Sequence, residues 1–139
     1  MIAEEAIQDM TGVNRDIRVL VIDDDEFVRT TLCFALSAAG LDVVQAPNGD
    51  LALAMLQSRG ADVAIVDVFM PNKDGIEVIC DIRRYFPSLR VIAISGSHRS
   101  GAPDYLRVAR SLGADVTLAK PFPPVDLVAA VIGLTRQVA

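Results

Sequence analysis

Acidic side chains follow two of the mainly apolar runs in this 139-residue sequence, at the point where each run ends. Asp23–Asp25 come directly after the run 17–22, and Asp67 comes directly after the run 62–66. Carboxylates held close together repel one another, so such a cluster favours a bound cation. A few hard oxygen ligands with room left for water suit Mg²⁺ better than Ca²⁺ or a softer transition metal. With one His in the chain and neither Cys at the end of such a run, we expect no Cys/His zinc site.

A hydroxyl and an ammonium group follow two further apolar runs. Ser95 comes directly after the run 90–94, and Lys120 comes shortly after the run 115–118. Together with Mg²⁺, each of these groups could contact one oxygen of a phosphoryl group carried on Asp67. Lysine supplies only two of the 13 basic residues, so the presence of Lys rather than Arg at position 120 is informative. An ammonium group contacts a single oxygen atom, whereas the guanidinium group of Arg would present a planar fork of donors. The spacing therefore points to phosphoryl chemistry at Asp67.

The apolar runs alternate with segments of helical periodicity. Continuous apolarity without alternation is typical of strands that are buried on both faces. We expect strands over 17–22, 41–46, 62–66, 90–94 and 115–118, and helices over 28–39, 49–59, 75–86 and 106–112 and after 124. This order predicts an α/β fold, a doubly wound, flavodoxin-like (βα)5 parallel sheet with strand order 2-1-3-4-5. Residues 1–15 are expected to form an N-terminal tail, and 16–139 a single domain.

Ligands of doubly wound sheets bind beyond the carboxyl ends of the strands, where the strand order reverses. In the predicted order the first and third strands are neighbours. Asp23–Asp25 and Asp67 should therefore meet in one pocket, with Ser95 and Lys120 at the ends of the next two strands.

Four segments of the sequence resemble the receiver domain of two-component response regulators, over roughly residues 16 to 137. The matching segments are Val19–Asp25, Asp67–Gly75, Ile94–Gly96 and Ala119–Phe122. Each is a weak signal alone, but four of them in this order at the ends of the expected strands form a specific pattern. The resemblance implies a single-domain, chemotaxis-regulator-like phosphoacceptor switch in a phosphorelay. By this resemblance we expect a protein that is not an enzyme acting on a separate substrate, with chemistry limited to its own phosphorylation and dephosphorylation.

By this resemblance, Asp67 would accept a phosphoryl group from a sensor histidine kinase or a histidine phosphotransfer protein, in a reaction that depends on Mg²⁺. Asp23, Asp24 and Asp67 would bind the Mg²⁺ ion, with the backbone carbonyl of Phe69 as a further ligand. The resemblance thus assigns the expected metal site to the same residues that the spacing brings together.

The resemblance also implies how the switch would act. Lys120 would pair with the phosphoryl group, and Ser95 would contact it and move with it. Phosphorylation would then change the output face, the surface formed by the helix around 106–112, the strand 115–118 and the last helix. A downstream protein partner would bind there, and the resemblance is also compatible with a homodimer.

Two positions depart from the family pattern. Thr117 stands three residues before Lys120, where many receivers carry Tyr or Phe whose rotamer reports phosphorylation. A switch at Thr117 would therefore not use an aromatic ring. Phe69, two residues after Asp67, borders the path of attacking water, and we expect its ring to keep water from the adduct.

The net charge and the length of the apolar stretches limit the kinds of partner that this chain can bind. The net charge of −5, from 13 basic and 18 acidic residues, argues against direct binding of nucleic acid through a basic face. The longest apolar stretch, 127–134, is much shorter than the ~20 residues that cross a bilayer. Residues 1–5 are acidic where a secretory signal would be basic, so we expect a cytoplasmic chain with no membrane contact.

Two other classes of function stay open from the residues alone. A phosphatase that forms an aspartyl phosphate uses a related sheet, but its Asp-x-Asp-x-Thr/Val pattern fails at Phe27 and, for Asp67, at Phe69. A phosphorylation-independent interaction module would keep the acidic pocket without using it. Taken singly, Asp23–Asp25 could cap a helix and Asp67 could belong to a turn, but their joint placement favours the phosphoacceptor. For Asp25 the helix cap remains the better interpretation.

Overall fold

The computed structural model describes residues 17–69, 75–96 and 104–136. Within these residues, five parallel strands form one sheet in the order β2-β1-β3-β4-β5. The strands are β1 (Arg18–Ile22), β2 (Asp42–Ala46), β3 (Val63–Asp67), β4 (Arg90–Ser95) and β5 (Val116–Ala119), and the helices are α2 (Glu26–Ala38), α3 (Gly49–Ser58), α4 (Gly75–Tyr85), α5 (Tyr105–Ser111) and α6 (Pro124–Arg136). The predicted α/β fold and strand order are confirmed. The expected tail, 1–15, lies outside the described residues.

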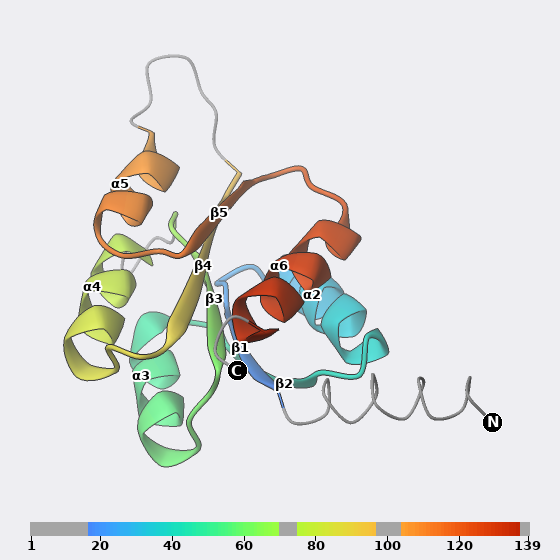
Figure 1. Cartoon of the computed structure of the whole chain (residues 1–139), viewed down its shortest axis with the longest axis horizontal. Helices are drawn as coiled ribbons and strands as arrows, with labels where there is room; N and C mark the ends of the chain where they lie inside the picture. The colour runs from blue at the N-terminus through green and yellow to red at the C-terminus, as the bar shows by residue number, and fades with distance from the viewer. Residues whose placement is uncertain (1–16, 70–74, 97–103, 137–139) are drawn as a thin grey trace.

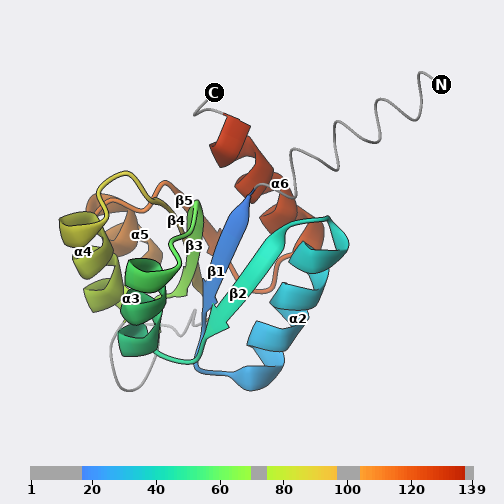
Figure 2. The same ribbon diagram turned by 90° about the horizontal axis from the view of Figure 1, so that it is seen from below.

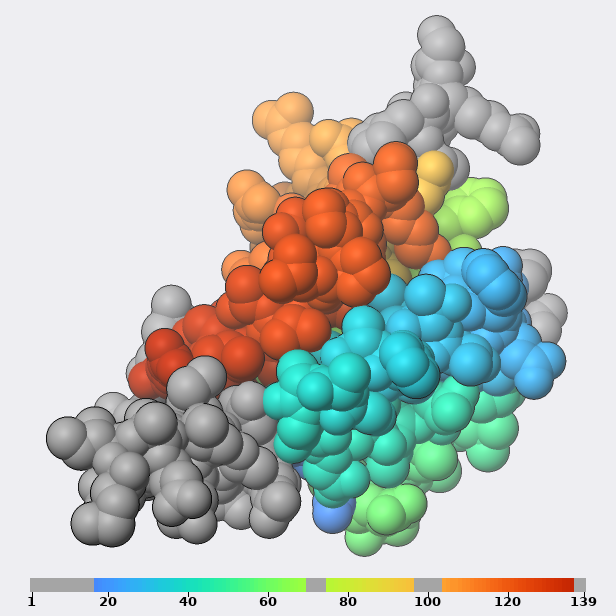
Figure 3. Space-filling view, turned by 90° about the vertical axis from the view of Figure 1, so that its right-hand side faces the viewer, coloured from blue at the N-terminus to red at the C-terminus, as the bar shows by residue number. Residues whose placement is uncertain are grey.

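Helices cover both faces of the sheet. α3, α4 and α5 lie on one face, and α2 and α6 lie on the other, as Figures 1 and 2 show. α2 and α6 run side by side and form one face of the molecule (Figure 3). In the part of the chain that is described, no helix has the length and apolar character to span a membrane.

The central strand β3 shows why the strand sequences are apolar without alternation. Val63 and Ile65 pack in the core beneath α2 and α6. Ala64 and Val66 pack in the core beneath α3, α4 and α5. Successive side chains point to opposite faces of a strand, and here both faces are buried. The sheet is thereby anchored on two sides, which fixes where the strands end.

Short polar side chains set the helix starts. Asp25 caps α2, with its side chain accepting hydrogen bonds from the backbone N–H groups of Phe27 and Val28. Asn48 caps α3 in the same way and accepts from Leu51 N–H, as its position in the sequence predicts. The cap at Asp25 turns the chain directly from the carboxyl end of β1 into α2, which leaves Asp23 and Asp24 in the connecting turn.

α4 begins in close contact with the end of β3. A Cβ atom at Gly75 would overlap the carbonyl oxygen of Asp67 and the Cα atom of Val68. Because both are backbone atoms, no side chain can move aside to make room. Gly75 therefore allows α4 to start beside the strand that carries Asp67.

We expect Gly75→Ala to lower the free energy of unfolding by about 1–3 kcal/mol, since the added methyl group forces the backbone apart. Gly133→Ala is the matched control, because a Cβ atom there meets nothing within 4 Å. Gly133 lies inside α6, where Ala is favoured over Gly by about 0.5–1 kcal/mol, so this variant should gain stability. Urea denaturation measures both. A Gly75→Ala protein as stable as the parent would contradict the close approach.

Candidate functional site

Three carboxylates meet at the carboxyl ends of β1 and β3. Asp23 and Asp24 follow β1 and Asp67 ends β3, and one carboxylate oxygen from each lies within 4.8 Å of the others. The two strands are direct neighbours in the sheet, with Ile22 paired to Val66. Asp23 is 0% exposed and Asp67 is 6% exposed, whereas Asp24 is exposed to solvent. The structure thus brings together the acidic residues that the sequence predicts.

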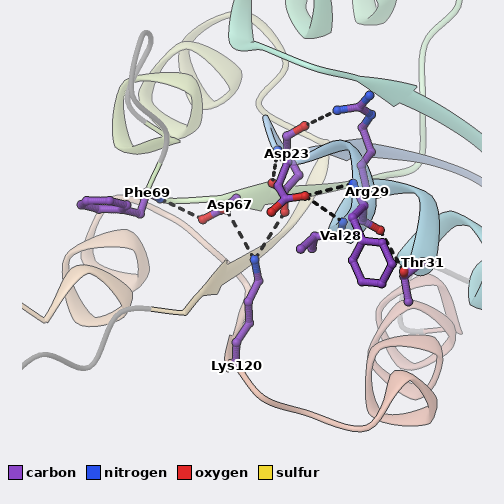
Figure 4. A network of polar contacts seen from close by, with 9 residues as sticks. Asp23, Val28, Arg29, Thr31, Asp67, Phe69 and Lys120 are labelled. Carbon is purple, nitrogen blue, oxygen red and sulfur yellow. Dashed lines mark hydrogen bonds and ion pairs between the residues drawn. The ribbon is translucent and has the colours of Figure 1, made fainter.

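The turn after β1 is held by its own backbone and by one arginine. Asp23 Oδ1 accepts a hydrogen bond from the Asp25 N–H group at 3.0 Å. Arg29 Nη1 donates to the carbonyl oxygen of Asp23 at 2.8 Å (Figure 4). Arg29 Nε donates to Gln45 Oε1 at 2.9 Å. Our sequence analysis missed Arg29. Its position one helical turn after the N-cap Asp25 is the signal that could have indicated it.

Lys120 reaches the cluster from the end of β5. Its Nζ atom lies 3.4 Å from Asp23 Oδ2 and 3.5 Å from Asp67 Oδ2 (Figure 4). The Lys120 N–H group donates to the carbonyl oxygen of Ser95 at 2.8 Å. Its aliphatic stem crosses Gly96, where a Cβ atom would lie 3.2 Å from Lys120 Cδ. The two Nζ–O distances are nearly equal, so one ammonium group is shared between two carboxylates. Both distances exceed the ~2.7–2.9 Å of a short charge-assisted hydrogen bond.

Asp67 is held in an environment that disfavours its charge. Burial raises the pKa of Asp67 from 3.8 to about 6, and the nearby Asp23 carboxylate adds to the rise. A hydrogen bond from Phe69 N–H to Asp67 Oδ1, at 2.9 Å, and the Lys120 charge act in the opposite direction. With a pKa near 6 the carboxylate is mostly ionised at neutral pH. It is also poorly neutralised, which favours its reaction with an electrophile.

The donor set fits a hard divalent cation. Carboxylate oxygens of Asp23, Asp24 and Asp67 lie close together, and the Lys120 ammonium group contacts two of these three carboxylates. The hydrogen bonds of Arg29 go to a carbonyl and an amide oxygen. Oxygen donors in this number suit Mg²⁺ or a similar ion rather than a soft metal.

Ser95 and Thr117 lie on the strands next to the acidic cluster. Ser95 is buried at the end of β4, one residue beyond the partner of Asp67 in the sheet. Thr117 lies on β5, and its Oγ1 atom accepts a hydrogen bond from Arg110 Nη2 of α5 at 2.8 Å. Thr117 is therefore tied to the helix that follows β4, not to the carboxylates.

The ring of Phe69 points away from the carboxylate of Asp67 (Figure 4). It is 57% exposed, and its centroid lies 5.8 Å from that of Tyr105, with the two rings inclined at 57°. In this arrangement the ring does not stand over the acceptor oxygens, which differs from the expected shield against water. Our sequence analysis missed Tyr105, because 35 residues of chain separate it from Phe69 and no spacing rule connects them.

A model of the response regulator receiver domain family matches residues 19–132. The chain belongs to this family. Receiver domains are signalling switches and are generally not classed as enzymes, and response regulators are phosphorylated by histidine kinases.

Known receivers and response regulators are similar to most of this chain. The response regulator MprA of Mycobacterium bovis is 37% identical over 122 residues, which cover 87% of this chain and 51% of that protein. The transcriptional regulatory protein TrcR of Mycobacterium tuberculosis is 35% identical over 124 residues, which cover 87% of this chain and 46% of that protein. The receiver domain of Francisella response regulator 1452 matches with a TM-score of 0.79 and 27% identity, over 88% of this chain and 99% of that one. Vibrio cholerae CheY4 matches with a TM-score of 0.76 and 28% identity, over 85% of this chain and 98% of that one.

The chain spans about half the length of the curated relatives it matches. TrcR is named a transcriptional regulatory protein, so the relatives include a protein that acts on transcription. The expectation that this receiver does not itself bind nucleic acid stays a prediction.

We expect Asp67→Asn to gain stability over the parent as the pH rises, in metal-free buffer. The folded pKa of Asp67, about 6, lies above its unfolded value of 3.8, so the parent loses stability as the pH rises from about 3.8 to about 6, where the unfolded chain ionises more readily than the folded one. The advantage of the nearly isosteric amide should grow by up to about 3 kcal/mol between about pH 3.5 and pH 7.5. Urea denaturation at several pH values measures it. A difference that does not change with pH would contradict the raised pKa.

Proposed function

We propose that this receiver is a phosphoacceptor switch in which Asp67 carries the phosphoryl group. The observation that carries the proposal is the buried Asp67 carboxylate, which shares the Lys120 ammonium group with Asp23 at the carboxyl edge of the sheet. This edge is where ligands of doubly wound sheets bind. The membership of the receiver family supports the same conclusion.

In the transfer step, a carboxylate oxygen of Asp67 attacks the phosphorus atom of a phosphohistidine on a sensor histidine kinase or a histidine phosphotransfer protein. The new O–P bond forms as the P–N bond breaks. The electron pair of that bond returns to the imidazole, which takes one proton and leaves neutral. A pKa near 6 keeps Asp67 ionised at neutral pH, so no base is needed to activate it.

Asp23, Asp24 and Asp67 would hold the Mg²⁺ ion, with the carbonyl oxygen of Phe69 as a further ligand. When bound, the ion neutralises negative charge that builds up on the phosphoryl oxygens. Lys120 would pair with a phosphoryl oxygen, because its Nζ atom already lies 3.5 Å from Asp67 Oδ2. Ser95, at the end of β4, would contact the phosphoryl group and move toward it.

Phosphorylation adds charge and acceptor oxygens at Asp67 and thereby shifts an equilibrium between two arrangements of the output face. In the structure this face consists of α5, β5 and α6, and Thr117 lies within it. A downstream protein, or a second copy of the chain, would bind the arrangement that the phosphoryl group favours.

Asp67→Asn should abolish the covalent adduct that the parent forms with a small acyl phosphate and Mg²⁺, since an amide is not nucleophilic enough to attack phosphorus. Asp25→Asn is the matched control: it makes the same change within the acidic run, and Asn keeps the helix cap that Asp25 provides. Intact mass measures the adduct. A full adduct on Asp67→Asn would refute the assignment, an absent adduct on the parent would favour the interaction module, and sustained turnover of the acyl phosphate would favour the phosphatase.

Millimolar Mg²⁺ should stabilise the parent by about 1–3 kcal/mol when its concentration is about 10–100 times the dissociation constant. Asp24→Asn should lose most of this gain, because it removes one of the three ligands. Without Mg²⁺ the same variant should be more stable than the parent, since one like charge is gone. Thermal denaturation with and without Mg²⁺ measures both effects, and Asp25→Asn should respond to Mg²⁺ as the parent does. Equal stabilisation of all three proteins would place the metal elsewhere.

A further inference from the structure

Phe69 connects the acceptor to a helix of the output face through two different parts of the residue. Its backbone N–H group donates to Asp67 Oδ1 at 2.9 Å. Its ring lies 5.8 Å from the ring of Tyr105, the first residue of α5. Tyr105 is itself partly buried against the core beneath α3, α4 and α5. One residue therefore contacts both the group that would be phosphorylated and the helix that would respond.

A second contact with α5 does not reach the acceptor directly. Thr117 Oγ1 accepts from Arg110 of α5 at 2.8 Å, which ties β5 to the helix. Thr117 carries no ring that could turn between an exposed and a buried position. An aromatic side chain that touches α5 is instead present at Phe69, which follows the acceptor by two residues.

We propose that the Phe69–Tyr105 ring contact carries the phosphorylation state of Asp67 to α5. The inference rests on the proposed function of Asp67 as phosphoacceptor. When the carboxylate becomes an acyl phosphate, its negative charge moves to the phosphoryl oxygens and Asp67 Oδ1 becomes a weaker acceptor for the Phe69 N–H group. The backbone at Phe69 then relaxes, and the ring moves with it because Cβ is fixed to that backbone.

The ring contact is suited to this role because it is directional and exposed. Aromatic pairs favour particular inclinations and separations, so a small displacement changes their attraction. The ring of Phe69 is 57% exposed, so it can leave Tyr105 without opening a cavity in the core. A ring contact of this kind biases an equilibrium between two arrangements by about two- to tenfold. Loss of the contact would shift the equilibrium between the two arrangements of α5 by the same factor.

Intrinsic fluorescence can follow Tyr105 directly. The chain has two tyrosines and no tryptophan, so Tyr85→Phe leaves Tyr105 as the single tyrosine. In this background, a small acyl phosphate with Mg²⁺ should change the tyrosine signal in step with the adduct measured by intact mass. Phe69→Leu keeps the N–H group and the carbonyl but removes the ring. Compared at the same amount of adduct, measured by intact mass, its Tyr105 signal should change at least about threefold less than that of the Tyr85→Phe protein.

Hydrogen exchange of the α5 amides gives a second readout. It is measured in proteins that keep Tyr85. Phosphorylation should change this exchange in the parent and in Tyr105→Phe, which keeps the ring, but not in Tyr105→Leu. Thr117→Val, which loses only the hydroxyl that meets Arg110, should respond as the parent does.

The outcomes separate the coupling from the proposed function. If Phe69→Leu and Tyr105→Leu form the adduct and α5 still responds as in the parent, the ring contact does not carry the signal. If the parent forms the adduct but neither Tyr105 nor α5 responds, the coupling is again overturned while the phosphoacceptor stands. If the parent forms no adduct, the proposed function fails and this inference fails with it.

Discussion

Two buried carboxylates share one ammonium group in this receiver, and the arrangement of the site follows from that shortage of positive charge. Lys120 Nζ stands 3.4 Å from Asp23 and 3.5 Å from Asp67. Burial of Asp67 raises its pKa to about 6, so the fold keeps a carboxylate that its surroundings do not fully neutralise. A bound divalent cation would relieve this imbalance. The same electrostatic shortage is the physical basis of the metal binding that we propose for the three carboxylates.

The apolar sheet is what makes such a cluster tolerable. β1 and β3 are buried on both faces, and their pairing fixes the positions at which Asp23 and Asp67 leave the sheet. The turn between β1 and α2 has little freedom, because Asp25 caps the helix and Arg29 binds the carbonyl of Asp23. Repulsion among the carboxylates is therefore resisted by hydrophobic burial and by backbone hydrogen bonds rather than relieved by movement.

The contacts that link the site to the proposed output face differ from the common family pattern. Thr117 replaces the aromatic residue of many receivers and is bound to Arg110. An aromatic ring is found instead on the acceptor side, at Phe69, and it meets Tyr105 at the start of α5. The route that we propose from Asp67 to α5 therefore runs through the rings of Phe69 and Tyr105 and not through a ring on β5.

The sequence by itself determined the fold and which polar residues follow the strands at one edge of the sheet. Strands buried on both faces must be apolar throughout, and parallel strands place Asp23, Asp67, Ser95 and Lys120 at one edge whatever their sequence separation. Only the tertiary structure decided how the side chains are directed. Lys120 lies 97 residues from Asp23 in the sequence, and its division between two carboxylates depends on distances that no pattern encodes. The contact of Arg29 with a carbonyl and the turn of the Phe69 ring toward Tyr105 likewise depend on packing between distant elements, because local spacing fixes the face on which a residue lies but not the partner that it meets.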